Sequence, residues 1–173
     1  MKTIKEIRNQ FKLHPTEIAS SIKYLAKMKI DYDVFLPSIN KNLQRDFVWT
    51  LDQKREIINS ILIGRHIPHI AVVDICDHES KVDSIYQIID GKQRLSSIID
   101  FYNNKFPIII DGVEYLFKDL PEDYQICIST QHLRIYRVVE EGVKISDQDK
   151  INWFKFINFA GTPQDGEHFN NLK

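Results

Sequence analysis

The stretch YQIIDGKQRLSSIIDFY, residues 86–102, constrains the fold more than any other part of this sequence. An apolar run leads into Asp90 and Gly91, and apolar residues recur at helical spacing after Arg94. This order predicts a buried strand that ends at a tight bend, with a helix beginning one or two residues later. Gly91 permits the bend because glycine adopts backbone conformations that other residues avoid. The chain is therefore expected to fold around a strand–turn–helix unit with an acid and two cations at its corner.

Apolar runs on either side of this corner predict further helices and strands. A helix is expected after Thr50 or Asp52, either of which can cap its start, and Gly64 ends it. A last helix is predicted from Ser146 onward. The segments with strand-like apolar patterns are residues 69–76, 85–89, 106–110, 113–117 and 132–140. Elements in this mixed order indicate a compact α+β (mixed α/β) domain with a small mixed sheet.

The first 30 residues are more basic than the rest of the chain. They contain seven Lys or Arg and two Asp or Glu, whereas the whole sequence has a formal net charge of −1. Apolar residues recur there at helical spacing, at Ile18, Ile22, Leu25 and Met28. The basic face can be a solvated surface or a nucleic-acid contact. The sequence thus predicts a basic N-terminal helical segment, residues 1–30, followed by a domain over residues 31–173.

The corner at Asp90 combines several features of an anion site. The first N–H groups of a helix lack internal partners and lie at the positive end of its dipole. Gly91 lets a ligand approach the backbone, and Lys92 and Arg94 add positive charge. Asp90 is expected to act as a helix N-cap, as a metal ligand or as a group that orients water, and Gln93 could position that water. The alternative is a surface helix in which Asp90 simply pairs with Arg94, one turn away.

A second cluster, LQRDFVW at residues 43–49, again joins a glutamine–arginine pair to aromatic residues. In an extended segment Arg45, Phe47 and Trp49 would share one face. We expect Phe47 and Trp49 to be core residues rather than platforms for stacking bases. Gln44 and Arg45 are harder to assign to a core, because a cation beside apolar residues needs a partner.

The two clusters together resemble the N-terminal domain of GmrS/GmrD-type modification-dependent restriction systems, in the ParB/sulfiredoxin-like superfamily. The central motif of that family, Asp-Gly-Gln-Gln-Arg, corresponds here to residues 90–94, DGKQR. Its upstream Gln-Arg-x-aromatic-x-Trp motif corresponds to residues 44–49, QRDFVW. Downstream, INFAGTP resembles a family segment in which an asparagine, here Asn158, precedes a Gly-Thr turn. The resemblance covers about residues 35–170.

The resemblance implies a ParB/sulfiredoxin-like fold that binds and hydrolyses a nucleoside triphosphate at the Asp90–Arg94 corner, an activity that regulates a DNA nuclease in relatives. The catalytic residues it implies are Asp90, Gln93 and Arg94. The implied phosphate-binding residues are Gln44, Arg45, Gly91, Lys92 and Arg94. Asp90 would be the ligand of any Mg²⁺ that accompanies the nucleotide.

Two positions depart from the family pattern. Lys92 stands where the central motif has a glutamine, and Phe156 stands where relatives often have an arginine, two residues before Asn158. The HNH-type nuclease domain of the family has no counterpart in these residues. We therefore expect either a stand-alone regulatory module or one whose partner is a separate HNH-type nuclease chain, with modified DNA as a candidate signal, in a restriction-modification defence system.

Two other functions fit the same residues. The corner could grip a backbone phosphate of DNA without hydrolysis, or the domain could be a ParB-like nicking nuclease. No P-loop pattern is present, so triphosphate chemistry would not be of that class. No apolar run approaches the ~20 residues that span a bilayer, and the first ten residues lack an apolar signal core, which predicts a cytoplasmic protein.

Overall fold

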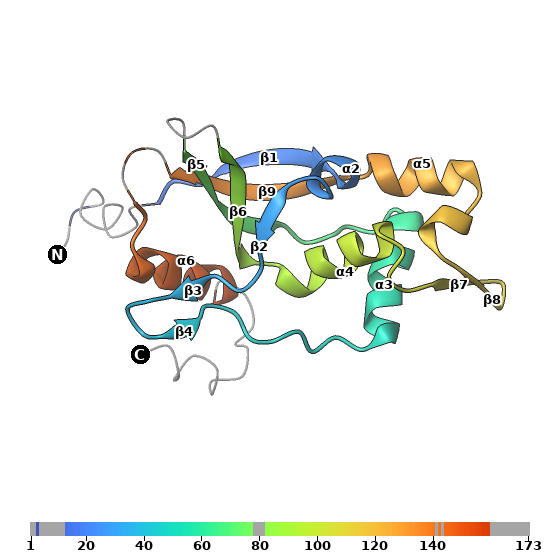
Figure 1. Ribbon diagram of the computed structural model, residues 1–173, viewed down its shortest axis with the longest axis horizontal. Helices are drawn as coiled ribbons and strands as arrows, with labels where there is room; N and C mark the ends of the chain where they lie inside the picture. Colours follow the sequence, from blue (N-terminus) through green and yellow to red (C-terminus); the bar gives the residue numbers. More distant parts are fainter. Residues whose placement is uncertain (1–2, 4–12, 78–81, 141, 143, 160–173) are drawn as a thin grey trace.

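A five-stranded mixed sheet forms the centre of the molecule (Figure 1). The computed structural model describes residues 3, 13–77, 82–140, 142 and 144–159. In spatial order, the strands are β1 (Thr16–Ser21), β9 (His132–Glu140), β5 (Ile70–Asp77), β6 (Val82–Asp90) and β2 (Lys29–Asp31). β5 runs parallel to β9 and antiparallel to β6, while β1 pairs antiparallel to β9 and β2 parallel to β6.

Helices and two small hairpins complete the fold. The helices are α2 (Ile22–Leu25), α3 (Leu51–Leu62), α4 (Lys92–Tyr102), α5 (Glu122–Thr130) and α6 (Asp147–Phe159), with a 3₁₀ turn at Phe117–Asp119. The hairpins are β3 (Phe35–Leu36) with β4 (Lys41–Asn42), and β7 (Ile108–Ile110) with β8 (Val113–Tyr115). This arrangement confirms the predicted α+β class. None of the described helices has the length and apolar character needed to cross a membrane.

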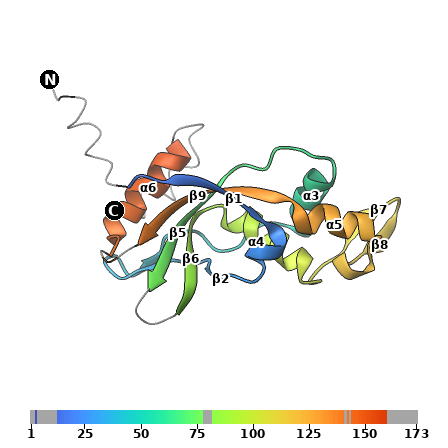
Figure 2. The same ribbon diagram turned by 90° about the horizontal axis from the view of Figure 1, so that it is seen from above.

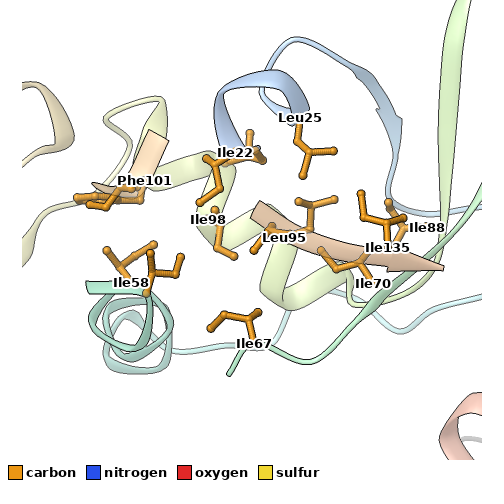
Figure 3. Close-up of a cluster of buried hydrophobic side chains, with 14 of the residues drawn as sticks. Ile22, Leu25, Ile58, Ile67, Ile70, Ile88, Leu95, Ile98, Phe101 and Ile135 are labelled. Atoms are coloured by element: carbon orange, nitrogen blue, oxygen red, sulfur yellow. The ribbon is translucent and has the colours of Figure 1, made fainter. Parts of the chain in front are cut away.

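Two apolar clusters lie on opposite faces of the sheet, because successive side chains of a strand point to opposite sides. Ile70 and Val72 of β5 belong to the first cluster, whereas Ala71 and Val73 belong to the second. Figure 3 shows the first cluster, in which side chains of α2, α3 and α4 meet those of the sheet. The second cluster joins the sheet to α6 and to the β3–β4 region, and Figures 1 and 2 show these elements at the opposite end of the molecule from the β7–β8 hairpin.

The N-terminal segment differs from its prediction. The helix predicted from Ile18 to Met28 is wrong for its first half, since residues 16–21 form strand β1 and only the single turn α2 is helical. All six residues of β1 pair with β9, so tertiary pairing outweighs the helical spacing of the apolar residues. Ile22 and Leu25 are nevertheless fully buried. Residues 4–12 of the predicted helical segment lie outside the described residues.

Most other elements agree with the sequence-based prediction. The 50–63 helix is confirmed as α3, with Thr50 as N-cap in a reciprocal capping box with Gln53. The strands predicted at 106–110 and 113–117 are confirmed as the shorter β7 and β8, which form a hairpin, and the strand predicted at 132–140 is confirmed as β9. Helix α5 was not predicted, although Pro121 followed by two acidic residues is a start signal for a helix.

Candidate functional site

The corner between β6 and α4 has the predicted strand–turn–helix form. Gly91 is the N-cap of α4, with a left-handed φ of 95°, and no side chain caps the helix. The N-cap role expected for Asp90 is therefore wrong. A Cβ atom on residue 91 would lie 3.1 Å from Ile70 Cγ1 and 3.3 Å from Arg94 Nη2. Residue 91 must therefore be glycine for two reasons: its φ is positive, and neighbouring atoms leave little room for a side chain.

A register shift in the sheet helps to aim Asp90. Ala71 of β5 pairs with Asp90, but Val72 pairs with Ile88, so β6 contains one extra residue immediately before the corner. A β-bulge of this kind bends its strand and redirects the adjacent side chains. The end of β6 therefore departs from the regular strand geometry, and Asp90 lies two residues before the first residue of α4.

Arg94 donates to two acceptors, and one of its buried nitrogen atoms has no partner among the described residues. Its Nη2 atom donates to Asp90 Oδ2 at 3.0 Å and to the carbonyl oxygen of His69 at 2.9 Å. Its Nε atom is buried and has no hydrogen-bond partner among the described residues. The Asp90–Arg94 pair of the alternative interpretation does form, but both side chains are about one-fifth exposed rather than fully solvated. The pair thus leaves the guanidinium with capacity for another acceptor.

Gln93 joins the two sequence clusters directly. Its Oε1 accepts the backbone N–H groups of Val48 at 3.0 Å and Trp49 at 3.2 Å, and its Nε2 donates to the carbonyl oxygen of Asp46 at 3.1 Å. Both ends of the amide are occupied by the backbone of the upstream cluster. Gln93 therefore fixes residues 46–49 against the start of α4.

Gln44 and Arg45 reach the same place from the loop before α3. Gln44 Nε2 donates to the carbonyl oxygen of Ile88 at 2.6 Å, which ties this loop to β6. Arg45 is exposed, and no ion-pair partner for it lies in the described part of the chain. Its charge is therefore available to a ligand.

Lys92 points to a partner within the protein. Its ammonium group donates to Asp33 Oδ1 at 2.6 Å, and the Lys92 side chain is 7% exposed. Asp33 is positioned by the turn before it, where Asp31 accepts the N–H groups of Asp33 and Val34. The charge of Lys92 is thus largely neutralised by Asp33, and the pair anchors the start of α4 to the turn after β2.

These side chains line a cavity of about 350 Å³. Its lining residues are Gln44, Arg45, Trp49, Asp90, Gly91, Lys92, Gln93, Arg94, Phe154 and Asn158. All seven residues proposed from the sequence are among them, although two segments nearly fifty residues apart supply them. Its volume lies within the usual range of ligand sites, ~300–1,000 Å³.

Helix α6 supplies a wall that the candidate residues did not include. Phe154 and Asn158 lie one turn apart on α6, and Asn158 Nδ2 donates to the carbonyl oxygen of Phe154 at 2.8 Å. In the sequence Asn158 stands out only as part of the downstream motif. Phe154 carries no signal beyond its helical spacing, and Trp49 is expected to be a core residue. Their presence in the cavity depends on how α6 docks, which no local pattern encodes.

A buried polar network holds α6 in place. Lys150, 4% exposed, donates to Gln87 Oε1 at 2.6 Å, and Gln87 Nε2 donates to Asp31 Oδ2 at 3.1 Å. Burial lowers the pKa of Lys150, while Glu140 and Asp147 favour its charged form. Because Asp31 also orders the turn that carries Asp33, the network connects α6 with the anchor of Lys92.

The electrostatic balance of the cavity favours an anion. Among the described residues of the lining, Asp90 is the single acidic one, and Arg45, Lys92 and Arg94 are basic. Asp33 neutralises the charge of Lys92, and Asp90 neutralises that of Arg94. The positive charge that remains comes from Arg45 and from the N-terminus of α4. Among the described residues, no group of three His, Cys, Asp or Glu side chains could hold a metal ion.

The sequence matches the family model of the GmrSD restriction endonuclease N-terminal domain over residues 22–172. This chain belongs to the GmrSD N-terminal domain family. The match covers most of the chain and includes the segments that line the cavity. No curated protein and no solved structure matched the sequence.

Membership of the GmrSD family connects the chain with modification-dependent restriction systems. The two departures from the family pattern now have a structural setting. Lys92, in place of the motif glutamine, pairs with Asp33. Phe156, in place of the frequent arginine, is 55% exposed and does not line the cavity.

Proposed function

We propose that this domain binds a nucleoside triphosphate in the cavity at Gly91 and hydrolyses it, and that the nucleotide state regulates a DNA nuclease. One observation carries the proposal: two sequence clusters bring Arg45 and Arg94 to the same cavity as the N-terminus of α4. Guanidinium groups and free backbone N–H groups are the donors that phosphate oxygens prefer.

The phosphates would lie against the start of α4. Gly91 has no side chain to block them, and the N–H groups that follow it lack a side-chain cap. Arg94 would turn its unpartnered Nε toward a phosphate oxygen, and exposed Arg45 would close over the phosphates from the other segment. Lys92 would serve as a positioning residue, because its ammonium group already pairs with Asp33.

Asp90 is our candidate for the group that acts on water. A phosphate that shares Arg94 would weaken the Asp90–Arg94 pair and leave a carboxylate oxygen free to orient the attacking water. Mg²⁺ in nucleotide sites is commonly held by one or two carboxylates together with substrate phosphates, and Asp90 is the carboxylate among the described lining residues that could do this. Bound Mg²⁺ would neutralise charge on the phosphates. Gln93 would keep Trp49 and its neighbours in place for this chemistry.

The regulated partner, in this proposal, is an HNH-type DNA nuclease, and modified DNA is the signal. A direct test is phosphate release from each of the four nucleoside triphosphates, with and without modified DNA and with Mg²⁺ or EDTA. We expect turnover of at least one triphosphate that is lost in Arg94→Ala and kept in Arg65→Ala, whose arginine pairs with Glu56 away from the cavity. Equal turnover in the two folded variants would contradict the proposal.

A further inference from the structure

The cavity contains aromatic surface that a phosphate site does not need. Trp49, from the loop before α3, and Phe154, from α6, line the same space as Arg45 and Arg94. Phosphate oxygens gain nothing from apolar walls, because they lose hydration there without a hydrogen bond in return. The aromatic part of the lining therefore indicates a ligand with an apolar, polarisable portion.

A backbone hydrogen bond holds Trp49 beside the cavity. The Trp49 N–H donates to Gln93 Oε1 at 3.2 Å, which fixes this residue beside the start of α4. Trp49 is only partly buried, and it belongs to neither of the two apolar clusters. The expectation that it is a core residue is therefore wrong, because Trp49 is partly exposed and lines the cavity.

Phe154 forms a firmer wall. It is 6% exposed and belongs to the second apolar cluster, where it packs with Trp153 and Ile151 of α6. The buried network of Lys150 holds the same helix against β6. Trp49 and Phe154 thus come from two separately anchored elements, the backbone before α3 and helix α6.

Two side-chain amides offer acceptors beside the aromatic residues. Gln44 and Asn158 each use their nitrogen in a hydrogen bond to a backbone carbonyl, at 2.6 Å and 2.8 Å respectively. Their carbonyl oxygens have no partner among the described residues. Such oxygens accept hydrogen bonds from N–H groups, which the edges of nucleobases carry.

We infer that Trp49 and Phe154 form a nucleobase subsite, in which the base stacks on the indole and Asn158 accepts a hydrogen bond from its edge. This inference rests on the proposed function and names its ligand as a nucleotide, in contrast to inorganic polyphosphate. Base–aromatic stacking tolerates different bases because each has a π face. The subsite therefore raises the affinity for nucleotides as a class.

The test compares ligands with and without a base. Titration calorimetry would measure binding of ATP, CTP, GTP, UTP and inorganic tripolyphosphate to the whole chain, under conditions without turnover. We expect the nucleotides to bind about tenfold or more tightly than tripolyphosphate. In Trp49→Leu this advantage should disappear, and in Asn158→Ala it should shrink. Trp49 is preferred over Phe154 for substitution because Phe154 is part of the core.

Tryptophan fluorescence gives an independent reading. The sequence has two tryptophans, and Trp153 is 2% exposed in the second apolar cluster, so a ligand in the cavity should quench Trp49 alone. We expect quenching by UTP or CTP but not by tripolyphosphate, and none in Trp49→Phe.

Each outcome separates the two proposals. If Trp49→Leu keeps the full nucleotide advantage while Arg94→Ala weakens both ligand types, the base subsite is refuted and the phosphate site stands. If neither nucleotides nor tripolyphosphate bind the folded protein, the proposed function itself fails. If only a single-stranded oligonucleotide quenches Trp49, the subsite holds a base of nucleic acid and the nucleotide assignment is overturned.

Discussion

Two aspartate–arginine pairs involve the β5–β6 hairpin of this domain. Asp90 and Arg94 meet at the corner of α4, with 3.0 Å between Oδ2 and Nη2. Asp74 and Arg137 meet further along the sheet, with 3.3 Å between Oδ2 and Nη1. In both arginines the Nε atom is buried without a partner among the described residues. The pairs share their chemistry and differ in their surroundings.

Asp74 is enclosed by other side chains. It is 3% exposed, and it also accepts hydrogen bonds from the hydroxyl of Ser84 and the thiol of Cys76. Asp90 is 21% exposed and faces a cavity beside a helix N-terminus and a second arginine, Arg45. The Asp74–Arg137 pair therefore supports the fold, because neighbouring side chains supply its remaining hydrogen bonds. The Asp90–Arg94 pair is a candidate binding site, because backbone N–H groups and open space lie next to it.

The largest effect is expected from breaking the enclosed pair. Arg137→Ala leaves the Asp74 carboxylate buried with only neutral partners, and should lower the free energy of unfolding by about 3 kcal/mol. Urea unfolding would measure this, while nucleotide binding per folded molecule should stay unchanged. A loss of binding without a loss of stability would reverse the roles that we assign to the two pairs.

The matching change in the cavity should affect chemistry instead. Arg94→Ala removes a donor whose loss is expected to reduce triphosphate turnover by about 100-fold or more. Because the Asp90–Arg94 pair is partly solvated, the free energy of unfolding should fall by only about 1 kcal/mol. Phosphate release and urea unfolding on the same sample would check both values. Normal turnover in a folded variant would end the catalytic interpretation of Arg94.

Glycine substitutions sharpen the comparison further. Gly91→Ala forces a left-handed φ on alanine, which costs about 1–2 kcal/mol, and places a methyl group against Ile70 and Arg94. Gly64→Ala is the matched control, since Gly64 has a φ of 70° and a methyl group added there would have nothing within 4 Å. We expect both variants to lose stability but only Gly91→Ala to lose turnover, because only this methyl group displaces Arg94. Equal turnover in the two would exclude a role for the open space at Gly91.

The smallest effect concerns the basic N-terminal region. Deleting residues 1–30 would remove β1 and most of β2 from the sheet, so charge changes are the better test. The double variant Lys23→Gln, Lys27→Gln should reduce the slope of log affinity for DNA against log salt by about 2 units, if both exposed lysines contact phosphates. Triphosphate turnover should not change. An unaltered slope would assign these lysines to a solvated face.

The corner could be predicted from sequence because its signals are contiguous. The apolar run before Asp90, the glycine and the helical spacing after Arg94 lie within one short stretch, and each has a local physical meaning. Strand β1 could not be predicted in the same way. Its identity depends on pairing with β9, more than a hundred residues later, which outweighs its own helical spacing.

The candidate site could be predicted in part for the same reason. The two glutamine–arginine clusters identify Gln44, Arg45 and residues 90–94, but not the contacts that each makes. Gln93 binds the backbone N–H of Trp49, and Lys92 pairs with Asp33. Both contacts depend on the packing of segments that are distant in the sequence. The roles proposed for these residues in binding and hydrolysis stay predictions.

The cavity walls come from three widely separated parts of the chain: the loop at Arg45, the corner at Gly91 and helix α6 at Phe154. During synthesis α6 emerges after every strand of the central sheet, so the last wall can close only when the fold is nearly complete. A ligand held by all three parts would bind the native state and not a nascent or partly unfolded chain, and would raise the melting temperature by mass action. Nucleotide occupancy would in this way report that the whole domain has been made and assembled.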